Sequence, residues 1–529
     1  MWSLKLVCPF AFLLLQTCIL PNVAGLPSSS TSSLNAEVKN QGDNTNSHKV
    51  LILGGGVAGI IAARTLRQSG VNDFLIIEAR SEIGGRMMSK SFGSKSKGNG
   101  TQYTIEQGAN WIQGTQDGKS AANPIFDLAK KHSLKNQFND FYNSVLTYDA
   151  TGQVDFLTTL NKSEDQFAAL TVLAGSRIDQ GLVDVTGRTG YSLVGAKATD
   201  PHSAASEYMQ FDFEYAQSAG QTSLIAASWN NNYTYNVDQG GFSDENNMSV
   251  DQRGFKTLIQ KEAAEFLKPN QIVYNSTIKK IQYTDHGATV TLANGLTYTG
   301  EYALCTFSLG VLQHDDVTFE PSLPEYKKEA ISSMVMATYT KIFLQFPKKF
   351  WFNTEMGLYA DSERGRYPIW QSLDHPDFLP GSGIIFVTVT GDFANRVEGL
   401  PDAQVKAEVL SVLKSMFPTT DIPEPLDFFF PRWRANPLFR GSYSNWPPYF
   451  SSDHLINLKS NIGKLYFAGE ATSRKYYGFL HGAYFEGQAI GTTIAGCIRN
   501  TSCPDLPRIP QITNSDPYQL TARAIADEL

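Results

Sequence analysis

The sequence predicts an α/β protein in which a domain built on a parallel sheet is interleaved with an α+β domain. A short apolar strand at 49–54 is followed by a glycine-rich turn, a helix and a second strand. Elements of the same type recur in the middle and near the end of the chain. The length of 529 residues exceeds what one hydrophobic core organises, so two or more domains are expected.

The first unit predicts two parallel strands joined by a helix. "KVLILG" (49–54) and "FLIIEA" (74–79) are short apolar strands, and "GIIAARTLRQSG" (59–70) has helical periodicity and ends at glycine. A strand, a crossing helix and a second strand in one sheet give parallel pairing.

The later elements follow from the same periodicities. We expect helices within 123–133, 162–174, 402–417 and 480–498, a hairpin with an Asn-Gly turn at 288–307, and strands within 337–346, 384–393 and 463–472. Because elements of the first type occur at three separate places in the chain, the two domains should interleave.

The turn after the first strand predicts a dinucleotide site. Gly54, Gly56 and Gly59 fit G-x-G-x-x-G: they permit a tight turn, a close approach to a pyrophosphate, and packing of the helix on the strand. The free N–H groups of the helix N-terminus favour the anion. Glu78 ends the second strand at the distance expected for an acid that accepts hydrogen bonds from ribose hydroxyls.

The next segment distinguishes flavin from nicotinamide. "EARSEIGGRM" (78–87) resembles the extended dinucleotide motif of FAD-dependent amine oxidases. The resemblance implies that Gly84, Gly85 and Arg86 form a second loop over the pyrophosphate, with Arg86 neutralising charge. It also places Ala58, Ala79 and Arg80 among the cofactor-binding residues.

Further motifs extend this resemblance from about Val50 to Ile498. They are "DQRGF", "IEQGANWIQG", "STIKKI", "SLGVLQ", "TYTKIFLQFPKKFW", "PRWRANPLFRGSYSNWP" and "LYFAGEATSRKYYGFLHGAYFEG". Together they are most similar to plant-type polyamine oxidases. Such a protein would have a Rossmann-like FAD-binding domain, predicted at 48–115, 252–325 and 432–500, and a substrate-binding domain, predicted at 116–251 and 326–431. No cysteine stands in the family's covalent-attachment context, so FAD should be noncovalent.

The family likeness assigns several roles. Lys341 would lie near the reactive flavin nitrogen through a water and act in catalysis by electrostatics and proton handling. Glu470 would bind the ribityl chain, and Ile278 would hold the adenine end through its backbone. Leu480 opens the last helix, whose N-terminus can face the polar edge of the flavin.

Aromatic residues should enclose the amine. The resemblance places Phe479 and Tyr443 on two walls facing the flavin, with Trp433 nearby, and Phe479 also contacts the cofactor. The family usually has Tyr at position 479 and often Phe at position 443, so the hydroxyl has changed sides.

Carboxylates decide which charge the site prefers. "EYMQFDFEYAQ" matches a segment that supplies an acid to the tunnel; Glu214 is the first choice, with Glu207 and Asp212 as alternatives. At Gln113 plant-type enzymes have Glu and animal-type enzymes have His. The amide of Gln113 neither attracts a polycation nor accepts its proton. At this position the chain therefore differs from both groups of enzymes in a property that affects polyamine binding.

The predicted activity is flavin-dependent oxidation of spermine- or spermidine-like amines by hydride transfer, with dioxygen as oxidant and an aldehyde, an amine and hydrogen peroxide as products. One alternative is a monoamine or L-amino acid oxidase, in which Arg432 or Arg434 would clamp a carboxylate. Another is a flavin-bearing protein with little oxidase activity. The eight histidines show no metal-ligand spacing, and His481 is expected to pack rather than act as a base.

The two ends of the chain concern targeting. Residues 1–25 predict a cleaved signal peptide, with a retained anchor as the alternative, 26–47 a flexible leader, and 501–529 a C-terminal tail. No later segment predicts a membrane span. The terminal Ala-Asp-Glu-Leu resembles a lumenal retention signal, so both export and the endoplasmic reticulum lumen are expected destinations.

Cysteines, sequons and charge add smaller expectations. A local disulfide between Cys497 and Cys503 is plausible, and Cys305 should be buried. Sequons compatible with secretion stand at Asn99, Asn161, Asn232, Asn247, Asn275 and Asn500. The net charge of -7 without a basic run argues against nucleic acid and for a cationic partner. The sequence does not specify an oligomeric state.

Overall fold

The computed structural model describes residues 46–94, 100–118, 121–500, 503 and 505–510, which all belong to one compact unit, Asn46–Leu529. The predicted signal peptide, nearly all of the predicted leader and most of the C-terminal tail lie outside the described residues. The first strand begins at Ser47, the last residue of the predicted leader.

The first sheet has eight strands in the order β10-β2-β1-β13-β12-β11-β14, with β22 also beside β13. Its strands are β1 Ser47–Leu53, β2 Phe74–Ile77, β10 Ile272–Val273, β11 Ile278–Thr284, β12 Gly287–Leu292, β13 Thr297–Cys305, β14 Thr318–Glu320 and β22 Leu465–Phe467. Strands β10, β2, β1, β13 and β22 pair in parallel, and β11, β12 and β13 pair antiparallel through the predicted hairpin. The predicted α/β fold is confirmed.

Burial explains the sequence of the parallel strands. Residues Val50–Leu53 and the whole of β2 are buried and apolar, as expected for strands covered on both faces. Several helices contribute residues to the hydrophobic cores that contain the strands of the first sheet. Among them are α1 Val57–Gln68, α2 Pro124–Lys131, α8 Thr257–Ala264, α9 Leu309–Leu312, α10 Glu325–Ser333, α13 Ser452–Lys459 and α14 Leu480–Arg499.

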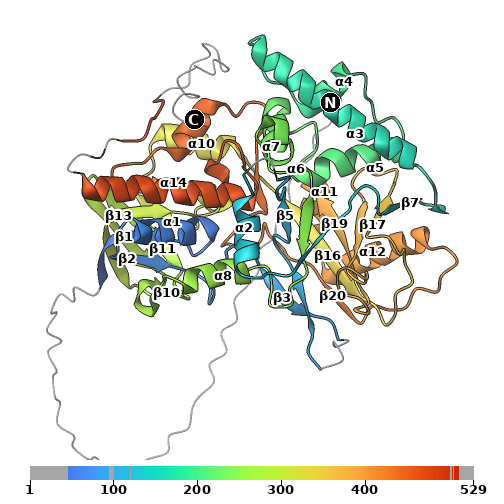
Figure 1. Ribbon diagram of the computed structural model, residues 1–529, viewed down its shortest axis with the longest axis horizontal. Helices are drawn as coiled ribbons and strands as arrows, with labels where there is room; N and C mark the ends of the chain where they lie inside the picture. Colours follow the sequence, from blue (N-terminus) through green and yellow to red (C-terminus); the bar gives the residue numbers. More distant parts are fainter. Residues whose placement is uncertain (1–45, 95–99, 119–120, 501–502, 504, 511–529) are drawn as a thin grey trace, which may run out of the picture. The chain divides into compact units, whose positions relative to one another are not determined.

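Helices α1 and α14 lie side by side (Figure 1). Small residues allow this close approach. A Cβ at Gly487 would stand 2.3 Å from the carbonyl oxygen of Ala58, and one at Gly491 would stand 2.9 Å from that of Ala62. The glycines of α14 therefore set the distance between the two helices.

The second sheet has seven strands in the order β20-β16-β19-β18-β17-β7-β8. They are β7 Val145–Asp149, β8 Gly152–Gln153, β16 Tyr339–Gln345, β17 Met356–Tyr359, β18 Ile369–Ser372, β19 Ile384–Thr390 and β20 Asp427–Phe429. Apolar residues of α11 Gly391–Glu398 and α12 Asp402–Met416 share a buried core with these strands. The strands come from two stretches of the chain that alternate with those of the first sheet, as the interleaved prediction requires.

A helical region and three small sheets complete the fold. The helices are α3 Leu157–Asp179, α4 Gly187–Leu193, α5 Pro201–Glu207, the π-helical turn η2 Tyr208–Asp212, α6 Phe213–Tyr215 and α7 Leu224–Tyr235, and short 3-10 turns are η3 Val237–Gln239, η4 Pro269–Gln271 and η5 Glu470–Thr472. The small sheets pair β3 Ser89–Phe92 with β4 Tyr103–Glu106, β15 Val335–Ala337 with β21 Tyr443–Asn445, and β9 Asn246–Ser249 with both β5 Trp111–Gln113 and β6 Asn136–Phe138.

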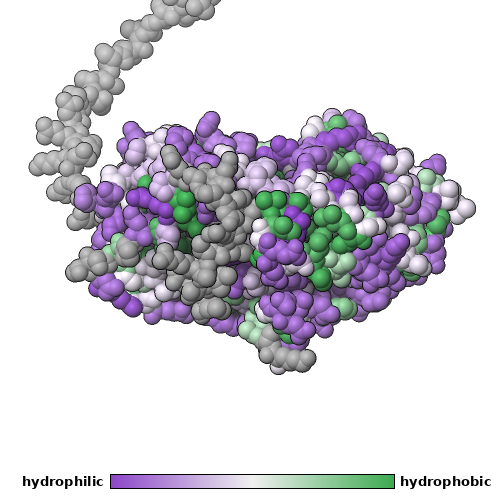
Figure 2. Space-filling view, turned by 90° about the horizontal axis from the view of Figure 1, so that it is seen from above, coloured by the Kyte–Doolittle hydropathy of each residue, from purple (hydrophilic) through white to green (hydrophobic). Residues whose placement is uncertain are grey.

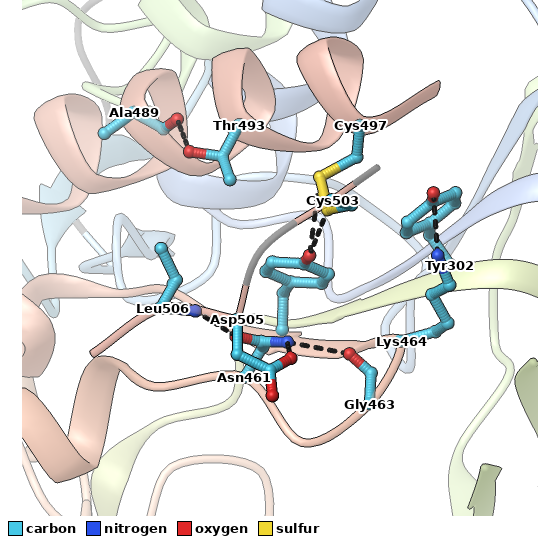
Figure 3. The surroundings of a disulfide bond; sticks show 11 residues. Tyr302, Asn461, Gly463, Lys464, Ala489, Thr493, Cys497, Cys503, Asp505 and Leu506 are labelled. Atoms are coloured by element: carbon cyan, nitrogen blue, oxygen red, sulfur yellow. Dashed lines mark hydrogen bonds between the residues drawn. A yellow bond between two sulfur atoms is a disulfide. The ribbon is translucent and has the colours of Figure 1, made fainter. Parts of the chain in front are cut away.

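A disulfide joins the end of α14 to the segment that follows it (Figure 3). Cys497 and Cys503 are bonded, as predicted, and the Tyr466 hydroxyl lies 3.1 Å from the Cys503 sulfur. Asn461 holds the same segment through the Asp505 carboxylate (3.0 Å) and the Leu506 N–H (2.7 Å). Cys305 is buried, which confirms the second cysteine prediction.

Most of the face shown in Figure 2 is hydrophilic, with a few groups of apolar side chains. Exposed large apolar residues occur at the end of α3 and beyond it, namely Val172, Leu182, Val183 and Leu193. In the part of the chain that the structure describes, no helix combines the length and apolar character needed to cross a membrane.

Candidate active site

A cavity of about 720 Å³ joins the glycine-rich turns of the first sheet to aromatic residues of the second sheet and the helical region. It is lined by most of the predicted site residues: Gly54, Gly56, Ala58, Glu78, Ala79, Arg80, Gly85, Arg86, Gln113, Glu214, Ile278, Trp433, Tyr443, Glu470, Phe479 and Leu480. Gly59 and Lys341 are not part of the lining: Gly59 packs against Gly54, and Lys341 contacts the lining residues Gly108 and Asn110 from behind.

The two glycine turns, at 54–59 and 84–85, form a cradle. They lie so close together that side chains at several of these positions would collide with neighbouring atoms. Gly54 has φ of +118°, which a side chain rarely permits. A Cβ at Gly59 would stand 2.1 Å from the Gly54 carbonyl oxygen, so Gly59 serves the packing of α1 and not contact with a ligand. A Cβ at Gly85 would stand 3.2 Å from the Cα of Gly56. The two turns therefore meet at the cavity, as the extended motif predicts.

Two helices begin at this cavity. Gly56 is the N-cap of α1 and Phe479 is the N-cap of α14, and within the described residues no side chain caps either helix. Their first N–H groups therefore remain available, and the positive ends of two helix dipoles face one space. This arrangement favours a ligand that carries negative charge at two points.

Glu78 lies buried at the end of β2. Its carboxylate accepts hydrogen bonds from the N–H groups of Gly55 and Arg80, both at 2.7 Å. Burial raises the pKa of Glu78, and these N–H groups oppose the shift. The carboxylate is thus held at the cavity wall beside the glycine turn. Ile278 opens β11 and also lines the cavity, two residues after Ser276, whose N–H donates to the Glu78 carbonyl at 2.9 Å.

Arg86 and Glu470 form an ion pair at the wall, with Nη1 and Oε1 2.9 Å apart. Arg86 also donates to the Ser442 carbonyl at 2.9 Å, and Glu470 accepts from the Gly478 N–H at 2.8 Å. The pair connects the second glycine loop to the segment before α14. Arg86 therefore positions Glu470 in addition to the charge-neutralising role predicted for it.

Lys341 lies behind the cavity wall. Its ammonium donates to the Gly108 carbonyl (2.6 Å) and to Oδ1 of Asn110 (2.9 Å), and both of these residues line the cavity. Nζ also lies 5.5 Å from the centre of the Trp111 ring. Burial lowers the pKa of Lys341, and the charge of Glu106 opposes this. The position is consistent with an influence on a ligand through one intervening group.

The far half of the cavity is aromatic. Tyr443 and Phe479 line it, as predicted, and Tyr443 donates from its hydroxyl to the Glu214 carbonyl at 2.8 Å. Trp433 is buried and packs against Phe439 with ring centroids 5.5 Å apart. The sequence reasoning missed other aromatic wall residues: Trp111, Phe141, Phe213, Tyr235 and Tyr339. Tyr339 shares a strand face with Lys341, so strand alternation could have found it.

Of the three candidate acids, only Glu214 lines the cavity. Glu214 lines the cavity, accepts from the Tyr235 hydroxyl at 3.2 Å, and has its pKa raised to about 7 by burial. Glu207 and Asp212 both pair with Arg364 at 2.8 Å, away from the cavity wall. These alternatives are therefore structural ion pairs.

Gln113 ends β5 at the cavity, opposite Asn246 in the β5–β9 pairing. Its main-chain carbonyl accepts from Asn123 at 2.8 Å. Asp244 also lines the cavity and was missed, because no pattern in its segment separates it from an ordinary loop acid.

The arginines invoked for an amino-acid substrate do not line the cavity. Arg432 donates to the Leu400 carbonyl (2.8 Å) and pairs with Asp402 (2.6 Å), and Arg434 is exposed. The prediction that Arg432 or Arg434 would bind the carboxylate of an amino-acid substrate is therefore wrong. His481 is buried, stacks on Phe479, and has its pKa lowered to about 3 by burial. It packs as an uncharged ring, as expected.

Comparisons with known proteins identify the family of this chain. Residues 57–490 match the family described as flavin containing amine oxidoreductase. Polyamine oxidase 6 of Oryza sativa subsp. japonica is 33% identical over 481 residues, covering 87% of this chain and 93% of the relative. Polyamine oxidase 1 of Zea mays is 32% identical, covering 86% and 92%. A solved putrescine oxidase bound to putrescine has the same fold, with a TM-score of 0.66 at 16% identity, covering 85% of this chain and 99% of that one.

The chain belongs to the flavin-containing amine oxidoreductase family. It is an enzyme, and its cofactor is FAD. The described residues fit that group: two glycine turns that exclude side chains, two uncapped helix N-termini, and a buried carboxylate at the end of β2.

Proposed function

We propose that this enzyme oxidises polyamines of the spermidine and spermine type. The observation that carries the proposal is Glu214, a carboxylate inside an aromatic cavity that continues from the FAD cradle. Sequence similarity to plant polyamine oxidases over most of the chain supports the same substrate class. Bound FAD would supply the hydride acceptor for the carbon next to the amine nitrogen, water would hydrolyse the resulting imine to an aldehyde and an amine, and dioxygen, as the final oxidant, would leave as hydrogen peroxide.

The chain's own residues position the amine and adjust its charge. An amine must lose its proton before it can donate hydride, and the aromatic walls of Phe479, Tyr443 and Tyr339 disfavour the ammonium form by excluding water. Glu214 attracts a cationic nitrogen, which aligns a long amine along the cavity. Lys341 stands behind the wall and is placed to handle a proton or to stabilise negative charge through Asn110.

A peroxide assay with a substrate panel tests the proposal. Spermine and spermidine should give the highest kcat/KM, above a monoamine and an L-amino acid. A preference for the monoamine or the amino acid would instead identify the enzyme as a monoamine oxidase or an L-amino acid oxidase. Bound FAD without peroxide from any of these compounds would favour a flavin protein with little oxidase activity. Release of the flavin by acid precipitation would support noncovalent attachment.

Glu214→Gln should raise KM for spermidine by about tenfold, equivalent to about 1.4 kcal/mol. Because the pKa of Glu214 is raised to about 7, its carboxyl is neutral below that pH and charged above it. Apart from the rise that deprotonation of the amine itself causes, kcat/KM of the unmodified enzyme should show a component centred near pH 7, and the variant should lack this component.

Glu245→Gln is a matched control, because Glu245 is nearby and bonds to Thr115 without lining the cavity. The assignment fails if Glu214→Gln and Glu245→Gln give the same KM and pH profile.

Gln113→Glu should lower KM for spermidine by about two- to fivefold, the effect of about 0.5–1 kcal/mol for a partly exposed ion pair. The reason is that a second carboxylate would face a polycation at the cavity wall. Gln137→Glu on β6, the strand on the other side of β9, adds the same charge outside the cavity and should leave KM unchanged. Equal effects of the two substitutions would contradict a local role for position 113.

We also propose that the enzyme enters the secretory pathway and is glycosylated. The support is the signal-like residues 1–25 together with the terminal Ala-Asp-Glu-Leu. Asn161 is exposed on α3 and is the favoured acceptor, whereas the side chain of Asn247 donates to Asn136 at 2.8 Å. N-terminal sequencing of the protein from expressing cells should begin after Gly25, and Asn161→Gln should remove one glycan from its mass. An intact Met1 would contradict the proposal.

A further inference from the structure

A second, much smaller cavity lies beside Lys341. Its volume of about 20 Å³ suits one water molecule. Its lining includes Glu106, Asn110 and Lys341, together with Asp251 from the loop before α8. Asn110 lines both cavities, so it connects this chamber to the active site.

Glu106 is a buried carboxylate with fixed geometry. The Phe255 N–H donates to its Oε1 at 2.7 Å, and the Ser89 hydroxyl donates to its Oε2 at 2.8 Å. Each carboxylate oxygen retains further acceptor capacity. Among the described residues, Gly108 and Asn110 engage two of the three N–H donors of Lys341, which leaves one for the chamber or the active site.

We propose that Glu106 and Lys341 are linked through one water in this chamber, and that Glu106 is a positioning residue which keeps Lys341 in its ammonium form. The inference rests on the proposed catalytic role of Lys341, but it does not depend on which amine is oxidised. A nearby opposite charge stabilises a buried ammonium, and Glu106 is the carboxylate that shares the chamber with Lys341. The chamber is also a place where the pair can exchange a proton away from the substrate.

The electrostatic surroundings agree with this pairing. Burial lowers the pKa of Lys341 and raises that of Glu106, and the charge of each residue opposes the shift of the other. The other charged groups near the pair have partners of their own. Lys256 pairs with Glu82 at 2.6 Å, and Asp251 pairs with Arg253 at 2.6 Å.

The test is a pH titration of the absorption spectrum of bound FAD with no amine present. In the unmodified enzyme a spectral transition should report loss of the Lys341 charge, and Lys341→Met should abolish it. Glu106→Gln keeps the shape but removes the charge, so the midpoint should fall by about one pH unit. Asp251→Asn, in the same chamber, should leave the midpoint unchanged.

Two results would overturn the proposal: an unmodified enzyme without such a transition, or a Glu106→Gln enzyme that binds FAD and keeps the original midpoint. If Glu106→Gln does not bind FAD, Ser89→Ala decides. Ser89→Ala removes a hydrogen bond that stabilises the charged carboxylate, so the pKa of Glu106 rises and more of Glu106 is neutral near the midpoint. The midpoint should therefore fall, but by less than in Glu106→Gln. An unchanged midpoint would reject the proposed link between Glu106 and Lys341. Because no amine is used, these outcomes are independent of the proposed substrate class.

Discussion

Lys341→Met should lower kcat for spermidine by about a hundredfold or more, the range for loss of a positioned proton-transfer or charge-stabilising group. FAD should remain bound, because Lys341 lies behind the cavity wall and contacts it through Gly108 and Asn110. Stopped-flow absorption, with amine added first and dioxygen second, would show which half of the reaction slows.

Lys349→Met is the control. Lys349 follows the same strand, donates to the Asp374 carbonyl at 3.0 Å, and lies away from the cavity. Full turnover in Lys341→Met would remove this residue from the mechanism. Loss of FAD from Lys341→Met would instead assign it a structural role.

Gly487→Val should destabilise the protein by about 3 kcal/mol or more and remove most of its FAD. A Cβ at this position would stand 2.3 Å from the Ala58 carbonyl oxygen, so α14 cannot keep its place against α1. Since the N-termini of both helices face the cavity, their separation disturbs the cofactor site directly. The measurements are Tm and the ratio of flavin to protein absorbance.

Gly496→Ala provides the comparison in the same helix. A Cβ at Gly496 meets no atom within 4 Å among the described residues, so alanine should stabilise α14 by about 0.5–1 kcal/mol. If Gly487→Val retained FAD and Tm at the level of Gly496→Ala, close packing of α1 and α14 would not be what shapes the site.

The parts of the fold and site with a short sequence signature could be predicted. Gly54, Gly56 and Gly59 all lie where the first strand passes into the first helix, and Glu78 directly follows the second strand. Their spacing in the sequence is therefore enough to predict a dinucleotide site. The strands expected at 49–54, 74–79, 337–346, 384–393 and 463–472 have alternation or continuous apolar runs and correspond to β1, β2, β16, β19 and β22, whereas short strands such as β8, β14 and β20 were not expected. The resemblance to a family added Glu470, which no local pattern marks.

Other parts depend on contacts that spacing does not reveal. The sequence left Glu207, Asp212 and Glu214 as alternatives because an ideal helix does not predict the π-helical turn at Tyr208–Asp212. After that turn Glu214 lies on the cavity, while the other two acids meet Arg364. Glu106 and Lys341 belong to different strands far apart in the chain, so only the folded structure brings them to one chamber.

The cofactor cradle is made from the first and the last α-helices of the described chain, α1 and α14. During synthesis the glycine turns of α1 are complete long before α14 leaves the ribosome. FAD can therefore be captured firmly only after almost the entire polypeptide has emerged. A chain interrupted before Leu480 would contain every strand of the first sheet but would lack α14 beside α1, and it should be degraded without ever producing peroxide.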